Sequence, residues 1–188
     1  MKQQRTLDRH VALVAAAADL LEAEGWSALT HRRLTAQTGV PFSTITYYFA
    51  GIDELVEQAA AELARRHLDR ARTTVEALPR RRADAARAAA LVAEVLVGPE
   101  PTPQSLQALY DRYLRAGRTP ALRALVTGWN ADLDLLVADV LDRTGHRATT
   151  TQVRLLVAAL DGLLVTAIAE ADPDPVTSAV RVAASLVP

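Results

Sequence analysis

Residues 38–49 read TGVPFSTITYYF, and their composition differs from that of the segments around them. The segments on either side, LVAAAADLLEAEG at 13–25 and DELVEQAAAELARRHL at 53–68, are rich in Ala, Leu and Glu, which favour helices strongly. The quoted stretch instead combines hydroxyl-bearing and aromatic residues behind Gly39 and Pro41. It therefore predicts a turn and a short helix. The outward side chains of this helix are better suited to contacts with another molecule than to stabilising the helix.

Three local signals divide the surrounding residues into a helix-turn-helix. Thr30 is a suitable N-cap for a helix over 31–38, and Gly39 predicts the end of that helix. Pro41 stands where proline is best tolerated, in the first turn of the next helix. In a helix-turn-helix the second helix enters the major groove of DNA, where hydroxyls and rings can contact phosphates and base edges. An ordinary helical hairpin has the same spacing, so spacing alone leaves both interpretations open.

The rest of the chain is expected to be helical as well. Apolar residues recur at spacings of three and four, and alternation of period two is nearly absent, which predicts an all-α protein of about nine helices. The expected helices cover residues 7–24, 31–38, 41–48, 52–78, 79–97, 104–116, 120–143, 151–171 and 176–187. We expect an N-terminal domain over 1–50, with its motif at 30–49 and completed by the start of the helix at 52–78. A second helical domain is expected over 51–188.

The composition excludes several classes of protein. The 188 residues contain no cysteine, which excludes disulfides and Cys-based metal sites and makes a reducing cytoplasm the expected location. No uncharged run reaches the roughly 18–20 residues that cross a bilayer, so no membrane contact is expected. The four histidines are scattered, and no metal, nucleophile or phosphate-loop motif occurs. We therefore expect no enzyme, no cofactor and no metal.

Charge supports a nucleic-acid partner only locally, because the net charge of the chain is −1. Lys2, Arg5 and Arg9 form either a basic arm at the edge of DNA or a solvated N-terminus. Residues 80–82 read RRR after a proline, and the simplest interpretation is a solvated positive charge at a helix end.

Residues 1–60 resemble the TetR-type transcriptional regulators. The resemblance is carried by several apolar, glycine and capping positions in one register: Gly25, Leu29, Thr30, Leu34, Gly39, Val40, Thr44, Ile45, Phe49, Asp53 and Glu54. The segment LDGLL at 160–164 is similar to a common feature of the family's variable C-terminal part. The resemblance implies an all-α protein with an N-terminal three-helix DNA-binding domain and a C-terminal helical bundle for ligand binding and dimerisation.

The resemblance also implies which residues contact DNA. They are Thr30, His31, Arg32, Pro41, Phe42, Ser43, Thr44, Thr46, Tyr47 and Tyr48, while Val40, Ile45 and Phe49 pack inward. Two positions depart from the family pattern, because Thr46 stands where relatives place Tyr and Ile52 where they place Lys. Losing that Lys removes one ionic contact with a phosphate, so the salt dependence of DNA binding should be shallower by about one unit.

For the C-terminal bundle we select ligand and dimer residues. Pockets in helical bundles are lined by apolar and aromatic groups with a few polar ones, and the ligand candidates are Tyr110, Tyr113, Trp129, Asn130 and Asp161. Core packing is the alternative for Trp129, and a structural acid is the alternative for Asp161. The helix around 155–168 is apolar nearly all round and must be covered on both sides, which favours a dimer interface. The interface candidates are Leu156, Leu160, Leu163, Leu164, Val180 and Ala183.

The sequence thus predicts a cytoplasmic, homodimeric, DNA-binding transcriptional regulator. Its expected partners are double-stranded DNA with a palindromic operator, a second copy of the chain and a small-molecule effector that releases a repressor. The alternative is a helical homodimer that binds a ligand or partner protein and whose DNA-binding motif is weakened, an interpretation motivated by Ile52 and the near-neutral N-terminal region.

Overall fold

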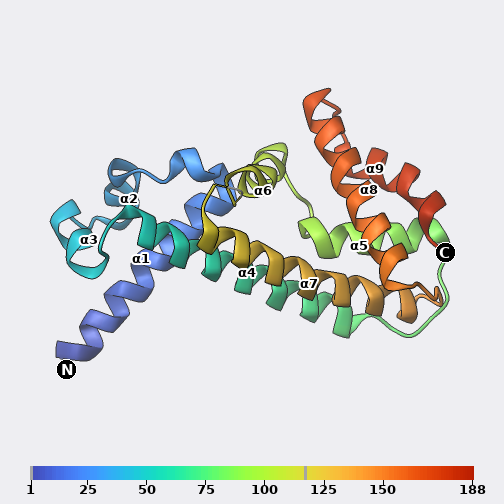
Figure 1. The fold of residues 1–188 in the computed structure, drawn as a ribbon, viewed down its shortest axis with the longest axis horizontal. Helices are drawn as coiled ribbons and strands as arrows, with labels where there is room; N and C mark the ends of the chain where they lie inside the picture. The colour runs from blue at the N-terminus through green and yellow to red at the C-terminus, as the bar shows by residue number, and fades with distance from the viewer. Residues whose placement is uncertain (1, 117) are drawn as a thin grey trace. The chain divides into compact units, whose positions relative to one another are not determined.

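The computed structural model describes residues 2–116 and 118–188, and side chains are described except for those of residues 2–7, 42, 43, 112, 113 and 116. Within this part of the chain there are nine α-helices, two short 3-10 helices and no strand, which confirms the all-α prediction (Figure 1). The elements are α1 Lys2–Glu24, η1 Trp26–Ala28, α2 His31–Thr38, α3 Phe42–Tyr48, α4 Ile52–Ala77, α5 Ala85–Val97, α6 Pro103–Ala116, α7 Pro120–Arg143, α8 Thr150–Ala169, α9 Pro175–Ala183 and η2 Ala184–Leu186.

The chain divides into two compact units. Unit one comprises Met1–Arg66 with Gln107–Val126, and unit two comprises His67–Leu106 with Thr127–Pro188. The first compact unit extends beyond the domain boundary predicted at residue 50, because the first part of α4 is needed to close its core. The boundary at 50 stays a prediction about the DNA-binding domain itself.

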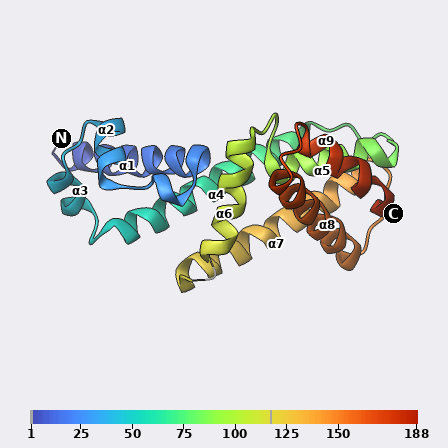
Figure 2. The same cartoon turned by 90° about the horizontal axis from the view of Figure 1, so that it is seen from above.

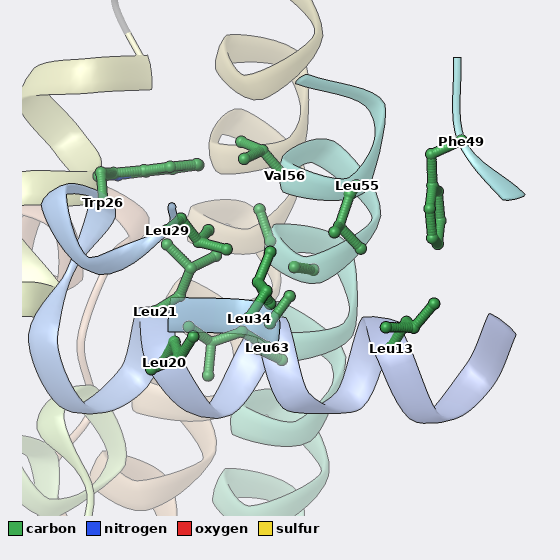
Figure 3. Packing of buried hydrophobic residues seen from close by; sticks show 14 of the residues in the cluster. Leu13, Leu20, Leu21, Trp26, Leu29, Leu34, Phe49, Leu55, Val56 and Leu63 are labelled. Atoms are coloured by element: carbon green, nitrogen blue, oxygen red, sulfur yellow. The ribbon is translucent and has the colours of Figure 1, made fainter. Parts of the chain in front are cut away.

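The core of unit one is built from leucines on one face of each helix. On α1 the buried residues Leu13, Ala17 and Leu21 recur every four residues, as one helical face requires. Figure 3 shows Leu13 and Leu21 turned toward Leu55 and Leu63 of α4, with Trp26 at one end of the cluster and Phe49 at the other. The same cluster holds Leu34 and Ile45 from the two motif helices, so the motif is fixed against α1 and α4.

An ion-pair cluster joins α1 to α4 on the outside of this core. Arg66 donates to Asp19 of α1 at 2.6 Å and to Glu62 at 2.7 Å, and Arg65 donates to Glu62 at 2.9 Å. The hydrogen bond from Arg65, followed by that from Arg66, holds the pKa of the Glu62 carboxyl below its ordinary value of 4.5. A carboxyl with a lowered pKa stabilises the fold above its ordinary pKa, and this contribution is lost as the pH falls through the lowered value.

Glu62→Gln is therefore expected to lower the free energy of unfolding near neutral pH by about 0.5–1 kcal/mol, as for other partly exposed ion pairs. The difference from the unsubstituted protein should disappear well below pH 4.5, where the Glu62 carboxyl is itself protonated. Urea unfolding across this pH range measures it. Glu57→Gln, on the same helix, is the matched control, since no ion pair of Glu57 occurs among the described residues. A pH-independent difference for Glu62→Gln would contradict the assignment.

Unit two is a bundle in which α5, α8 and α9 pack together (Figure 2). Each of these helices begins at a side-chain cap: Asp84 for α5, Thr149 with Gln152 in a capping box for α8, and Asp174 ahead of Pro175 for α9. His67 of α4 is buried, and its Nε2–H donates to the carbonyl of Val95 at 2.9 Å. This bond attaches α4 to α5 inside the unit.

One helix is shorter than predicted. The sequence pattern predicts helix over 79–97, but α5 begins only at Ala85, after its N-cap Asp84. The preceding residues pair instead with the end of α7, because the backbone N–H of Arg81 donates to Arg143 O at 2.9 Å and that of Ala83 to Thr144 O at 3.0 Å. These tertiary hydrogen bonds replace the helical ones that the sequence pattern suggested.

Candidate nucleic-acid interface

The turn of the motif is set by hydrogen bonds within a few residues. Thr30 has extended backbone angles, and its Oγ1 accepts the backbone N–H of Arg33 at 3.3 Å, so it caps α2 as predicted. Gly39 ends α2 with φ 66°, a left-handed conformation that favours glycine, and its N–H donates to Thr35 O. The Thr38 hydroxyl accepts the next N–H, from Val40, at 3.2 Å. These bonds predetermine where the chain turns between α2 and α3.

Helix α3 is short and is held by two buried side chains. Pro41 occupies the N-cap position, one residue earlier than predicted, and its carbonyl accepts the N–H groups of Thr44 and Ile45. Ile45 is 1% exposed and Phe49, which follows the helix, is 2% exposed. Val40 packs against the same core while only partly buried. The three inward positions predicted for the recognition helix therefore face the core.

The outward face of the motif is exposed over both helices. Thr30, His31, Arg32, Pro41 and Thr46 are exposed, and Tyr47 is the most open, at 78%. The side chains of Phe42 and Ser43, two further predicted DNA contacts, lie outside the described residues.

Two predicted outward residues are only half exposed. Thr44 and Tyr48 are of intermediate burial, and Tyr48 packs against the core of unit one. The Tyr48 ring also contacts the edge of His10 at a centroid distance of 6.4 Å, and His10 in turn stacks on Phe49 at 4.7 Å. Tyr48 is therefore only partly outward, and its contact with DNA stays a prediction. Because this ring supports the end of α3, its truncation would cost stability as well as any contact with DNA.

The two neighbouring arginines of α2 have different roles. Arg33 forms an ion pair with Glu24 at the end of α1 and so attaches α2 to α1. For Arg32, no ion pair is recorded among the described residues, and its guanidinium stays exposed on the outer face. Arg32 is therefore the cation of the motif that is available to a phosphate or a base.

Ile52 occupies the position at which the TetR-type regulators usually have a lysine, and it makes an apolar contact there. Ile52 begins α4, is partly buried and packs against the core of unit one. The first turn of α4 is otherwise acidic, with Glu54 accepting the N–H of Ala50 at 2.7 Å. This end of the motif thus offers hydrogen-bonded backbone but no cation.

The predicted ligand residues are divided between the two units. Tyr110 lies in unit one, and the side chain of Tyr113 lies outside the described residues. Trp129, Asn130 and Asp161 lie in unit two. Trp129 is 5% exposed, and its ring meets that of His67 edge-on at 5.1 Å.

His67 is a further candidate for a ligand-binding residue, and it was not predicted from the sequence. The signal available was a histidine on the inward face of α4, on the stripe that includes Leu68 and Ala71, but a lone histidine at such a position carries no ligand pattern. Among the described residues, no group of three His, Cys, Asp or Glu side chains converges in a way that could hold a metal ion.

The predicted dimer residues are mostly inside the chain. Leu156, Leu160, Leu164 and Ala183 are 0% exposed in unit two, so no surface of these side chains remains for a partner, and only Leu163 and Val180 are partly exposed. The exposed stripe of α8 lies on its other side and contains Leu155, Ala158, Gly162 and Val165, at spacings of three and four. Of the described helices, α8 alone is long and apolar enough to span a membrane, and 28% of its apolar window is buried in the chain.

Comparison with known proteins identifies the family of the chain. The family model "Bacterial regulatory proteins, tetR family" matches residues 13–59, and the model "Tetracyclin repressor-like, C-terminal domain" matches residues 83–188. No curated protein matches the chain.

Solved structures resemble the chain over nearly its whole length. The multidrug binding protein EbrR in complex with imidazole is 29% identical, with a TM-score of 0.69, over 96% of this chain and 95% of that one. A member of the TetR family from Streptomyces coelicolor A3 is 26% identical, with a TM-score of 0.62, over 94% and 96%. A transcriptional regulator from Saccharomonospora viridis in complex with choline shares the fold at 14% identity, with a TM-score of 0.74, over 95% and 94%. With a helix-turn-helix at α2 and α3 and a C-terminal match over more than half of its length, the chain belongs to the tetR family of bacterial regulatory proteins.

Proposed function

We propose that this chain is a cytoplasmic transcriptional repressor that binds a palindromic operator as a homodimer and is released by a small molecule. The observation that carries the proposal is the exposed outer face of the motif, which includes Thr46 and Tyr47 of α3 and, on α2, the guanidinium of Arg32, for which the described residues show no ion pair. Arg is the side chain best suited to a phosphate or guanine contact, and exposed hydroxyls and rings can reach base edges and thymine methyl groups.

A gel-shift assay with the DNA upstream of the chain's own gene tests this proposal, with a scrambled duplex of equal length as competitor. We expect sequence-specific binding that weakens as salt is raised, because phosphate contacts release counterions. Arg32→Gln should weaken DNA binding by about tenfold. Arg33→Gln instead removes the ion pair with Glu24 that attaches α2 to α1. Absence of any sequence preference at moderate salt would favour the alternative, a homodimer that binds a ligand or protein with an inactive motif.

Ile52→Lys is expected to strengthen DNA binding and to increase the slope of log K against log salt by about one unit. A lysine here can lie along the apolar surface with its stem while its ammonium reaches solvent at the start of α4. Quantitative titration of the operator at several salt concentrations measures the slope. Ala61→Lys, an exposed site on the same helix, adds the same charge away from the motif and is the control. Equal slopes for the two variants would place residue 52 away from the phosphates.

For the dimer we propose that the exposed stripe of α8 packs against its copy in a second chain. Leu155 is 56% and Val165 is 46% exposed, and such apolar surface on a soluble protein marks an interface. Between them, Ala158 and Gly162 are small and allow two helices to approach closely. Val182 of α9, at 53%, and Leu186 of η2, at 37%, are further exposed apolar side chains of unit two. Two-fold pairing would present two motifs to the two halves of a palindrome.

For the effector we propose a flat organic cation held in unit two beside Trp129. The Trp129 indole and the His67 ring meet edge-on and are each 5% exposed, and aromatic rings of this kind stabilise cations. Solved relatives support this choice, since EbrR is complexed with proflavin and with ethidium. Adding proflavin or ethidium to the protein–operator complex should release the DNA. Because both dyes also intercalate into duplex DNA, the control measures binding of each dye to the protein in the absence of DNA. Binding without release would contradict the proposed induction.

A further inference from the structure

A cavity of about 410 Å³ lies in unit two where the segment between α4 and α5 passes beside the turn between α7 and α8 (Figure 1). The segment is held by the two backbone hydrogen bonds from Arg81 and Ala83 described above. The guanidinium of Arg143 also donates to Leu78 O at 2.9 Å. His146 Nε2 lies 3.1 Å from Ala83 O. The walls of the cavity are therefore fixed by tertiary bonds rather than by a mobile loop.

The three consecutive arginines at this position do not share one role. Arg80 pairs with Asp142 at 2.6 Å and with Asp139 at 3.9 Å, as expected for a charge at a helix end. Arg143 takes the other oxygen of Asp139 at 3.0 Å. These acids are thus already neutralised. All three arginines of the RRR run are exposed, as the interpretation of a solvated charge requires, but only Arg80 pairs with the acids at the end of α7.

Arg81, Arg82 and Arg87 line the cavity, and no side-chain partner is recorded for any of them within the described residues. The one acid in the lining, Asp84, accepts the backbone N–H of Arg87 at 2.7 Å and caps α5. Three arginines and one aspartate among the lining residues give the cavity a net charge of +2, and all three arginines are also exposed to solvent. Like charges held together without a counterion repel each other, so an anion bound here would be favourable.

Arg82 is also positioned by the backbone. Gly145, in the turn after α7, has φ +84°, and a Cβ placed on it would lie 3.2 Å from Cγ of Arg82. The aliphatic stem of Arg82 therefore lies directly on this glycine. Glycine at this position both permits the left-handed backbone and leaves room for the stem.

We propose that this cavity binds a small organic anion carrying two negative charges and a short apolar group, such as a phosphate monoester. Guanidinium groups bind phosphate oxygens through paired, charge-assisted hydrogen bonds. Leu78, Pro79 and Leu91 supply apolar lining for the rest of the molecule. The volume falls in the range of small-ligand pockets. A nucleic acid would need an extended basic surface, whereas Asp139 and Asp142 adjoin this site.

Calorimetric titration of the full chain at low ionic strength, with butyl phosphate, inorganic phosphate and 1-butanol as probes, tests the proposal. We expect one saturable site for butyl phosphate, weaker binding of inorganic phosphate and none of 1-butanol. Arg81→Gln with Arg82→Gln should weaken butyl phosphate binding by about a hundredfold, at roughly tenfold for each lost charged hydrogen-bond donor. Arg87→Gln, on a different element, should weaken it by about tenfold.

The control removes two exposed arginines elsewhere, Arg9→Gln with Arg118→Gln, and should leave the affinity unchanged. Circular dichroism verifies that each variant keeps its helices, and the single substitution on α5 tests the site even if the double variant unfolds. An equal loss of affinity in the control would show that the change in net charge alone weakens butyl phosphate binding, and it would overturn the proposal. Absence of saturable binding, or equal affinity for butyl phosphate and inorganic phosphate, would also overturn it.

Discussion

Ile45→Ala is expected to lower the free energy of unfolding of unit one by about 2–5 kcal/mol and to abolish operator binding. Ile45 is 1% exposed and belongs to the core that joins α3 to α1 and α4. Removing its side chain leaves a cavity beneath a helix of only seven residues, which makes few other contacts of its own. Urea unfolding and gel-shift titration of the same preparation measure the two effects.

Tyr47→Ala is the matched control on the same helix. Tyr47 is 78% exposed, so its truncation should change the free energy of unfolding by no more than about 0.5 kcal/mol. Operator affinity should nevertheless fall by about tenfold if the ring contacts DNA. Comparing Ile45→Ala with Tyr47→Ala therefore separates the effect on folding stability from the effect on DNA recognition. A stable Ile45→Ala, or a Tyr47→Ala that unfolds, would show that the inward and outward faces of α3 are assigned the wrong way round.

Gly162→Leu is expected to convert the proposed dimer to a monomer. A Cβ at Gly162 meets no atom within 4 Å in the chain, so the substitution fits the monomer, and the better helix propensity should stabilise it by about 0.8 kcal/mol. In the proposed dimer the leucine would meet the partner helix twice, once from each chain, at a cost of about 1–3 kcal/mol each. Dimerisation should weaken by at least about thirtyfold, and operator binding should weaken with it.

Gly128→Leu makes the same change on α7, where Gly128 is also exposed and also meets no atom within 4 Å. This variant should gain helix stability and remain dimeric. Sedimentation velocity over a range of protein concentrations measures the dimerisation of both variants. A monomeric Gly128→Leu or an unchanged Gly162→Leu would move the interface away from the exposed stripe of α8.

The helix boundaries of the motif could be predicted from sequence because the groups that set them are close in the chain. The Thr30 hydroxyl caps an N–H three residues away, Gly39 needs only its own backbone freedom, and the Pro41 carbonyl accepts N–H groups of the next turn. Such interactions act in almost any tertiary setting. The inward positions Ile45 and Phe49 followed from the same register, and the structure buries both.

The side of α8 that is proposed for the dimer could not be predicted in this way. The helix is apolar on nearly all sides, so the sequence has no polar face to mark the solvent side. Packing against α5 and α9 buries the side with Leu156, Leu160 and Leu164 and leaves Leu155 and Val165 exposed. Four of the six residues predicted for the dimer consequently belong to the chain's own core.

Helical periodicity in the sequence was thus enough to predict the all-α fold, and the capping residues together with the resemblance to the TetR-type regulators were enough to predict the helix-turn-helix. Only the tertiary structure decided the partners of individual side chains. Tyr48 is drawn toward His10 and the core, and of three identical arginines one pairs with α7 while Arg81 and Arg82 line a cavity. The physical reason is that an ion pair or a buried ring depends on residues far away in the chain, whose positions local pattern does not specify.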